Sequence, residues 1–218
     1  MGSHYKIRTE KTGHFFMHGT MTSQTQYVWI CLHGYGQLAK YFISQFEFLD
    51  PVKNLVIVPE GMNRFYLDEK HDRPAANWLT REDRLDEIAD LILFLESLRS
   101  KLGWDKNKEI KVIYLGFSQG VTTLLRWLTT IHPRVDYLLL WAGTIPDDIL
   151  FDSSRSYFEK MNAHYFIGDE DRYLTPKIMT TQSSLIEKTG MQTEMHSFKG
   201  DHRIDIEVLK QFCTNYLV

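Results

Sequence analysis

Cysteine is scarce in this sequence of 218 residues, which holds only Cys31 and Cys213. The two lie far apart and lack the close spacing of metal-binding cysteine pairs, so the sequence shows no cysteine-based metal site. Cys31 falls inside an apolar run, where a buried thiol is common. We expect both residues to be free thiols in a reducing compartment, with a disulfide between them as the alternative.

Long apolar runs are also missing. None approaches the roughly 20 residues that a helix needs to span a bilayer. The first four residues, Met-Gly-Ser-His, are polar and do not lead into the apolar core of a secretion signal. These absences predict a soluble, cytoplasmic protein with no stable membrane association.

No charge of one sign dominates the sequence. The formal net charge is −3 at pH 7, and no run of lysine and arginine indicates a nucleic acid partner. Internal repeats, low-complexity tracts and Pro/Gly-rich linkers are absent as well. We therefore expect one domain over residues 1–218, long enough to bury roughly 70% of its unfolded surface. A monomer and a homodimer are both compatible with this composition.

What the sequence does contain is an alternation of short apolar runs with longer amphipathic segments, the pattern of a mostly parallel sheet with crossover helices. Runs such as Val28–Leu32 are apolar throughout, as buried parallel strands are. We expect Thr9–Glu10 and Phe15–His18 to form an antiparallel hairpin. The predicted strands are Phe15–His18, Tyr27–Leu32, Asn54–Val58, Lys111–Leu115, Tyr137–Trp141, Ala163–Ile167 and Thr193–Ser197.

The amphipathic segments predict helices on both faces of that sheet. In Glu82–Leu102 the apolar residues recur at helical spacing, and Gly103 follows as a C-cap signal. Thr175 before Pro176 fits an N-cap with proline at the first helical position. The predicted helices are Lys40–Phe48, Glu82–Leu102, Gln119–Ile131, Arg155–Met161, Pro176–Thr189 and Ile204–Leu217.

The segment Glu60–Arg81 follows neither pattern. A stretch of about 20 residues without secondary structure is usually a functional loop or a disordered one. The aromatic residues Phe65, Tyr66 and Trp78 favour a functional loop here.

The motif Gly116-Phe117-Ser118-Gln119-Gly120 follows a strong strand and begins a strong helix, which is the context of a nucleophile elbow. Such a turn strains the central residue, and side chains two positions before and after it would collide with the turn. Glycine therefore suits both places. The turn also puts Ser118 at a helix N-terminus, where the dipole favours negative charge. We predict Ser118 as a nucleophile, against a chance match of the motif.

A serine hydroxyl needs a base, and the base needs a third group to orient it. His202 follows the last predicted strand and precedes the last helix, so it can reach the carboxyl end of the sheet. We predict His202 as the base. His132 ends a helix, while His164 and His196 fall in strands, and we expect these three to be structural.

The acid should follow the strand Ala163–Ile167, because the chain order in the α/β-hydrolase fold is Ser, acid, His. The segment after this strand offers Asp169, Glu170 and Asp171. We prefer Asp171, with Asp169 as the alternative and Glu170 as a solvated charge.

An oxyanion hole needs two backbone N–H donors aimed at the developing charge. One donor should be Gln119 N–H, directly after the nucleophile. The other should come from the loop His33-Gly34-Tyr35-Gly36, which follows a strand, and we assign it to Tyr35 N–H. We expect His33 to brace this loop.

This chemistry requires no cofactor and no metal, and the scattered His, Asp and Glu residues show no ligand spacing. We expect the substrate to be a small acyl ester or thioester. The cleft that receives it should be lined by Phe65, Tyr66, Trp78 and Trp141, although Trp141 also fits a core position at a strand end. Arg64 either contacts an anionic group of the substrate or is solvated.

Together these motifs resemble the phospholipase/carboxylesterase family of α/β hydrolases, which includes the acyl-protein thioesterases. The resemblance implies that the second Asp of Gly-Asp-x-Asp, Asp171, is the triad acid. The sequence departs from the family pattern at Gln37, often Asp, at Val121, often Gly, and at Pro176, one position later than usual. The segments Asn63–Tyr66 and Asn77–Arg81 look like those of related bacterial predicted esterases. The segments that match the family motifs are Leu32–Gly36, Gly116–Gly120, Gly168–Asp171 and Gly200–His202.

The function predicted from these features is that of a serine carboxylesterase that works through an acyl-enzyme. A non-catalytic binding protein on the same fold is one alternative, since a fold does not fix a function. A lipase or peptidase of different selectivity is the other. A substrate panel that varies the acyl chain and the leaving group separates these classes.

Overall fold

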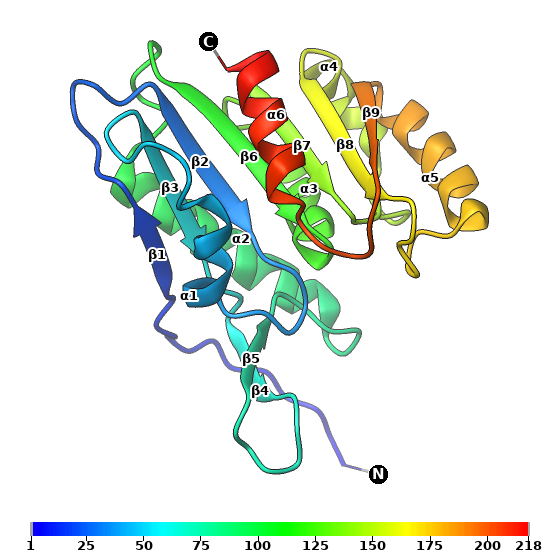
Figure 1. Ribbon diagram of the computed structural model, residues 1–218. Helices are drawn as coiled ribbons and strands as arrows, with labels where there is room; N and C mark the ends of the chain where they lie inside the picture. Colours follow the sequence, from blue (N-terminus) through cyan, green and yellow to red (C-terminus); the bar gives the residue numbers. More distant parts are fainter. Residues whose placement is uncertain (1, 218) are drawn as a thin grey trace.

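A seven-stranded sheet runs through the centre of the computed structural model, which describes residues 2–217 (Figure 1). The strand order is β1-β3-β2-β6-β7-β8-β9. Strand β1 is antiparallel to β3, and every other neighbouring pair in this sheet is parallel. The strands are β1 (Phe15–His18), β2 (Tyr27–Leu32), β3 (Asn54–Pro59), β6 (Lys111–Phe117), β7 (Tyr137–Trp141), β8 (Asn162–Gly168) and β9 (Gln192–Phe198).

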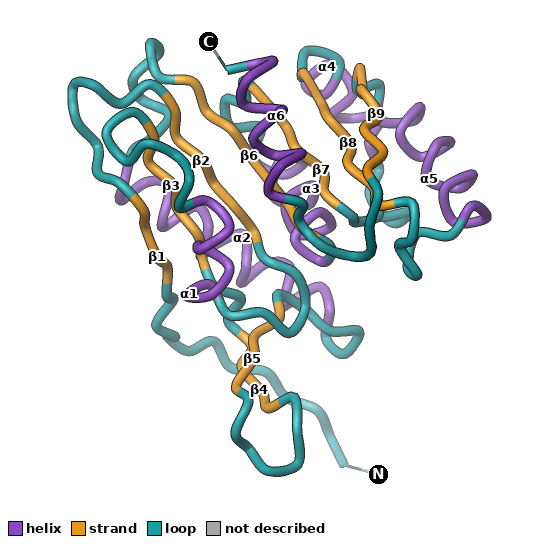
Figure 2. Tube along the Cα trace, in the orientation of Figure 1, coloured by secondary structure: helices purple, strands orange, loops and turns teal. Residues whose placement is uncertain are grey.

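Helices cover both faces of the sheet, as the sequence predicted. Figures 1 and 2 show α1 and α6 in front of the sheet and α2 and α3 behind it. The α-helices are α1 (Ala39–Phe42), α2 (Arg84–Leu102), α3 (Gln119–Ile131), α4 (Arg155–Phe158), α5 (Pro176–Thr189) and α6 (Ile206–Tyr216). Short 3-10 turns, η1 (Ile43–Phe46) and η2 (Phe151–Ser154), precede or follow the shortest of them.

The predicted strands and helices are confirmed, with ends that move by a few residues. The helix expected over Lys40–Phe48 is instead α1 continued by η1. Both cap predictions hold, because Thr175 accepts a hydrogen bond from Ile178 N–H and Gly103 adopts φ +61°. These local signals set the boundaries of the elements because they act through adjacent backbone groups.

Two predictions for the amino-terminal half of the chain, the first hairpin and the loop at Glu60–Arg81, are wrong. Residues Thr9–Glu10 form no strand, and β1 pairs with β3 rather than with a hairpin partner. The segment Glu60–Arg81 is not structureless, since β4 (Asn63–Tyr66) and β5 (Pro74–Asn77) form a separate antiparallel hairpin. In β4 half-buried and exposed residues alternate over only four positions, which is too short to stand out as a pattern in the sequence.

The core lies on both faces of the central strands. Every residue of β3 is buried, and β2 is buried after its first residue. Behind the sheet, Trp127 of α3 meets Tyr114 of β6 edge to face, with ring centroids 5.4 Å apart. In front, Trp29 of β2 contacts Phe46. Each such side chain contributes about 1.5–3 kcal/mol by leaving water, so burial on both faces of the central strands stabilises the fold.

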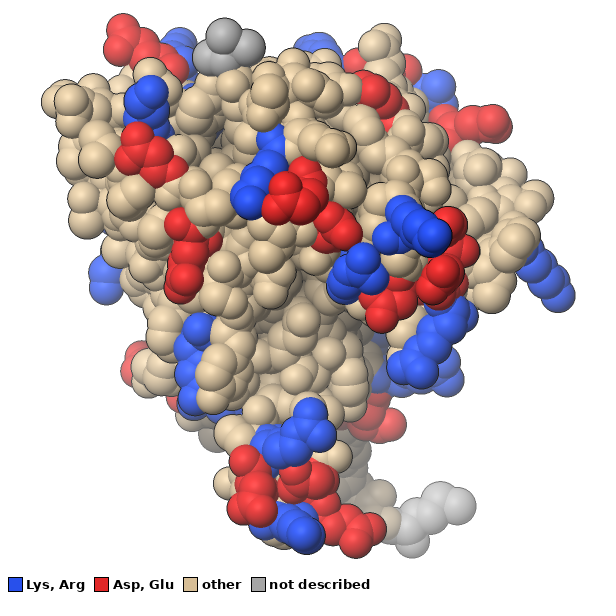
Figure 3. Space-filling view, viewed as in Figure 1, with Lys and Arg blue, Asp and Glu red and all other residues tan. Residues whose placement is uncertain are grey.

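The surface mixes both signs of charge. On the face drawn in Figure 3, acidic and basic side chains alternate, also on the hairpin that projects from the body. Within residues 2–217, no helix is long and apolar enough to cross a membrane.

Candidate active site

The turn between β6 and α3 holds Ser118 in a strained conformation, with φ 54° and ψ −117°. Its flanking glycines are required by close backbone approach. A Cβ at Gly120 would lie 2.1 Å from the carbonyl oxygen of Leu32, and one at Gly116 would lie 2.7 Å from the carbonyl oxygen of Gly120. The prediction that glycine suits both positions is therefore confirmed. Part of the crowding comes from the end of β2 and not from the turn alone.

Three side chains from three strand ends form one hydrogen-bonded series. His202 Nε2 lies 2.9 Å from Ser118 Oγ, and His202 Nδ1 lies 2.7 Å from Asp171 Oδ2. Ser118 follows β6, Asp171 follows β8 and His202 follows β9. The parallel register brings these carboxyl ends to one edge of the sheet, although the residues are far apart in the sequence.

The two aspartates after β8 have different partners. The Asp171 side chain is fully buried, and its Oδ1 accepts hydrogen bonds from the N–H groups of Tyr173 and Leu174. Asp169 Oδ1 accepts instead from Gly200 N–H at 2.9 Å. The geometry thus places Asp171 on His202 and gives Asp169 the task of holding the loop before His202.

The imidazole of His202 is positioned from several sides. Its ring lies 5.1 Å from the Phe117 ring and 4.7 Å from the Tyr173 ring, centroid to centroid. Trp141 Nε1–H donates to the carbonyl of Arg203 at 2.8 Å, which ties the loop that carries His202 to the end of β7. With these contacts the side chain of His202 is 19% exposed.

The loop after β2 is held in place by its own backbone groups and by the side chain of Gln37. Gly34 N–H donates to Gln37 Oε1, Gly36 N–H to Ala76, and Gln37 N–H back to Gly34. Within residues 2–217, Tyr35 N–H has no such acceptor. The amide oxygen of Gln37 thus fixes the loop at Gly34, at a distance of 2.8 Å.

His33 braces this loop from inside. Its Nδ1 lies 2.8 Å from the Gly34 carbonyl, and its Nε2 lies 2.9 Å from the N–H of Gly61. An N–H donor requires an unprotonated Nε2. Burial, which disfavours the charged ring, lowers the pKa of His33 from 6.5 to about 4. A neutral His33 thus accounts for both contacts and agrees with the bracing role expected from the sequence.

The side chain of Gln119 joins the elbow to the segment after β5, a contact that the sequence analysis missed. Its Oε1 accepts from Trp78 N–H at 3.1 Å, and its Nε2–H donates to the Leu79 carbonyl at 2.9 Å. Trp78 Nε1–H also donates to the carbonyl of His33 at 2.8 Å. One signal in the sequence pointed to this contact, the Gln directly after Ser118. The contact itself could not be predicted, because its partners lie about 40 residues away in the sequence.

Two of the four predicted cleft residues belong to the core. Trp141 is 0% exposed and stacks on Phe166 with ring centroids 4.3 Å apart, and Trp78 is 2% exposed. Both rings are therefore packed in the core and not exposed on a cleft, and for Trp141 this is the alternative that the sequence left open. Phe65 and Tyr66 do lie at the surface on β4, and the Phe65 ring is 5.1 Å from the exposed ring of Tyr35.

Arg64 is engaged within the protein. Its guanidinium forms an ion pair with Glu60, whose side chain is only 4% exposed. The other oxygen of Glu60 accepts from Ala39 N–H at 3.0 Å. The sequence suggested that Arg64 could contact an anionic group of the substrate. In the structure, Glu60 already binds the guanidinium of Arg64 and would compete with such an anion.

Two hollows of the surface lie apart from the hydrogen-bonded series. One, of about 1310 Å³, lies between the amino-terminal residues and α2. The other, of about 450 Å³, lies between α1, Gly36 and the Leu67–Pro74 loop of the hairpin.

A mostly parallel sheet with a serine, a histidine and an aspartate in series at its carboxyl edge is the arrangement of the α/β-hydrolase class. Residues 19–215 match the family model described as Phospholipase/Carboxylesterase. The chain therefore belongs to this family of hydrolases.

Solved structures show the same fold at low sequence identity. The esterase PE8 is 17% identical with a TM-score of 0.68, over 95% of this chain and 100% of that one. Acyl-protein thioesterase 2 of Zea mays is 16% identical with a TM-score of 0.69, over 93% and 97%. A phospholipase/carboxylesterase from Dyadobacter fermentans is 12% identical with a TM-score of 0.66, over 95% and 97%. No curated protein matches the chain by sequence.

Proposed function

We propose that this hydrolase is a serine carboxylesterase that cleaves small acyl esters or thioesters through an acyl-enzyme on Ser118. The observation that carries the proposal is the series Ser118 Oγ, His202 and Asp171, joined at 2.9 Å and 2.7 Å. These are the distances that proton transfer between nucleophile, base and orienting acid requires.

In the proposed mechanism, His202 moves one proton in each step. Ser118 Oγ attacks the acyl carbon while His202 Nε2 takes the hydroxyl proton. The buried Asp171 carboxylate accepts a hydrogen bond from His202 Nδ1–H, which keeps Nε2 free as the base and stabilises the imidazolium. His202 then gives its proton to the leaving alcohol or thiol, and water repeats the attack on the acyl-enzyme.

The developing oxyanion is stabilised by Tyr35 N–H and Gln119 N–H. Gln119 is the first residue of α3, where backbone N–H groups have no partner inside the helix and the dipole is positive. Removal of one such donor typically lowers kcat about 10²–10³-fold. The bonds that fix Gly34, Gly36 and Gln37 keep the Tyr35 peptide in place before the substrate arrives.

The hairpin supports a role in substrate selection. Phe65 and Tyr66 lie on β4, and Gly36 N–H donates to Ala76 of β5 at 2.9 Å, so the hairpin and the oxyanion loop are one connected unit. The pair of rings Tyr35 and Phe65 gives the acyl or leaving group an apolar wall. Phe65→Ala should therefore raise KM for long acyl chains more than for acetyl esters.

Ser118→Ala tests the proposal. The variant should lose p-nitrophenyl ester turnover and labelling by a fluorophosphonate, while its thermal unfolding stays that of the parent. Ser183→Ala is the matched control, because Ser183 is an exposed helical serine on α5 that bonds only to its own helix. Turnover that survives Ser118→Ala refutes the assignment of the nucleophile. Absence of turnover in the parent over a panel of acyl esters and thioesters refutes the esterase.

A further inference from the structure

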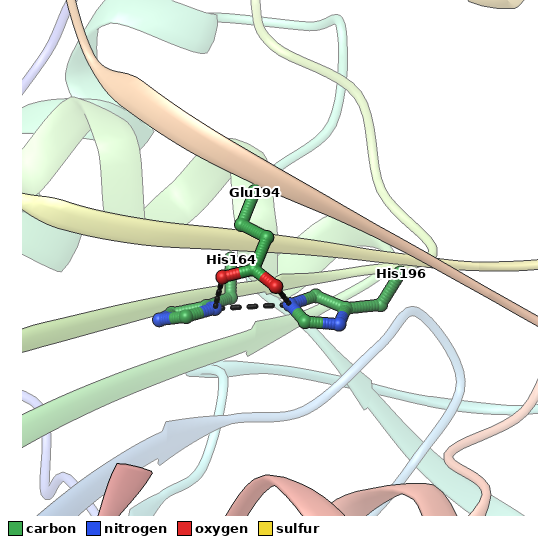
Figure 4. Close-up of side chains that lie close together, drawn as sticks. All are labelled: His164, Glu194 and His196. Carbon is green, nitrogen blue, oxygen red and sulfur yellow. Dashed lines mark hydrogen bonds and ion pairs between the residues drawn. The ribbon is translucent and has the colours of Figure 1, made fainter. Parts of the chain in front are cut away.

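A second cluster of chemically active side chains lies on the sheet face that α6 covers, apart from the proposed triad. Two imidazoles and one carboxylate point toward one another there (Figure 4). They are His164 of β8 with Glu194 and His196 of β9. The register pairs His164 with Glu194 and Phe166 with His196. Because alternate strand residues share a face, this register turns all three side chains to the same side.

The spacing of the ligand atoms suits a small metal ion. His164 Nδ1 lies 2.9 Å from His196 Nε2, and the oxygens of Glu194 lie 3.7 Å and 3.9 Å from these nitrogens. Tetrahedral zinc with bonds of about 2.0–2.1 Å places its ligands about 3.3 Å apart. The observed distances fall on both sides of that value, so shifts of about half an ångström would complete the site.

The ligands are held in this orientation by their surroundings. The His196 ring stacks on Phe166 at 4.5 Å and 12°. The His164 ring packs against the edge of the Tyr216 ring at 4.5 Å. Tyr216 Oη–H also donates to Glu194 Oε1 at 2.6 Å, which fixes the carboxylate. Partners of this kind behind the ligands orient metal sites and raise their affinity.

We propose that His164, Glu194 and His196 bind a divalent transition metal ion, with zinc as the best match. Two imidazole nitrogens and one carboxylate oxygen suit zinc, whereas magnesium and calcium prefer oxygen ligands alone. The His164 side chain is 5% exposed and that of Glu194 53%, so the site has a buried wall and an open side. Water can supply the fourth ligand from that side.

The location gives the ion a structural task. His164 lies near the start of β8, whereas Asp171 lies beyond the opposite end of that strand. The ion would join β9, the edge strand, to β8, and its Tyr216 contact would join both to α6. Metal binding to the folded state alone stabilises that state by mass action. The site therefore acts on stability and takes no part in the acyl transfer proposed above.

Zinc titration of the purified full chain, after chelator treatment and removal of the chelator, tests this site. Isothermal titration should give one equivalent of Zn²⁺, and zinc at 100 times Kd should raise the melting temperature by roughly 5–10 °C. His196→Gln and Glu194→Gln should each weaken binding at least about 10-fold and remove the shift. Tyr216→Phe should weaken binding about 10-fold while it keeps all three ligands. Cobalt should give a visible d–d spectrum in the parent and not in His196→Gln.

His202→Gln separates this site from the proposed triad. This variant should keep the full equivalent of zinc, although it loses esterase turnover. His196→Gln loses the stacking of a 21% exposed ring on Phe166 as well as the contact with His164, so its own metal-free melting temperature is the baseline for its zinc titration. Zinc binding that survives His196→Gln, disappears in His202→Gln or is absent in the parent overturns the proposal. Each of these outcomes leaves the Ser118 test unaffected.

Discussion

The replacement Asp171→Asn tests the most contested assignment of the site, the identity of the acid. Asp171 Oδ1 accepts two backbone N–H groups, from Tyr173 and Leu174, and Oδ2 lies 2.7 Å from His202 Nδ1. In the variant the amide oxygen would stay on the backbone donors, so the NH₂ group would face His202. The imidazole must then accept at Nδ1 and carry its proton on Nε2. In that tautomer Nε2 donates to Ser118 and can no longer take its proton.

The expected loss of kcat is large and specific. In serine proteases the equivalent change lowers kcat about 10⁴-fold through the wrong tautomer. At about 1.4 kcal/mol for each factor of ten, this amounts to about 5–6 kcal/mol of transition-state free energy. KM should change little, because Asp171 is buried and does not reach the substrate.

The matched control is Asp169→Asn. Asp169 Oδ1 accepts only from Gly200 N–H at 2.9 Å, and an amide oxygen can accept the same bond. The Asp169→Asn variant should keep kcat for a p-nitrophenyl ester within about tenfold of the parent value. The neutral amide oxygen replaces the carboxylate as acceptor for Gly200 N–H, so the loop before His202 stays in place. Equal losses in the two variants, or a larger loss in Asp169→Asn, would refute the choice of Asp171. Thermal unfolding of both proteins verifies that the loss is not one of folding.

Three further perturbations follow from the contacts of the site. Gly120→Ala should unfold the protein or lower its free energy of unfolding by several kcal/mol in chemical denaturation, because the new Cβ would lie 2.1 Å from a carbonyl oxygen. A denaturation curve like that of the parent would contradict this crowding. His33→Asn should flatten the pH dependence of stability. Burial lowers the pKa of His33 to about 4, so as pH falls from 6.5 toward 4 only the unfolded chain gains this proton, and the free energy of unfolding falls by about 3 kcal/mol. Identical slopes in parent and variant would exclude this cause. Trp141→Phe removes the indole N–H that donates to the Arg203 carbonyl and so loosens the loop that carries His202. The variant should lower kcat about tenfold with little change of KM. An unchanged kcat would show that this hydrogen bond does not position His202.

Much of the secondary structure could be predicted because local forces decide it. The buried parallel strands are continuous apolar runs, and the helix ends at Thr175 and Gly103 depend on adjacent backbone groups. The hairpin β4–β5 could not be predicted in this way. Its strands are four residues long, and its position depends on distant bonds such as the one from Gly36 N–H to Ala76.

The same division applies to the candidate site. The sequence indicates a nucleophile elbow through Ser118, the glycines at 116 and 120 and the strand before them. These residues could be recognised because the geometry of one short turn requires each of them. Trp78 and Trp141 were placed in the cleft for their aromatic character alone. Only the packing shows that Trp141 stacks on Phe166 and that both indoles donate hydrogen bonds to loop carbonyls.

By itself the sequence determined the alternation of strands and helices, and it indicated the elbow at Ser118 and the order in which the serine, the candidate acids and the histidine follow one another. The tertiary structure decided which carboxylate meets His202, since Asp169 and Asp171 are two residues apart and differ only in their partners across space. It also decided that His164 and His196 face each other across β8 and β9. Contacts between strands are set by the register of the sheet, and that register depends on all its strands packing together, which no short segment encodes.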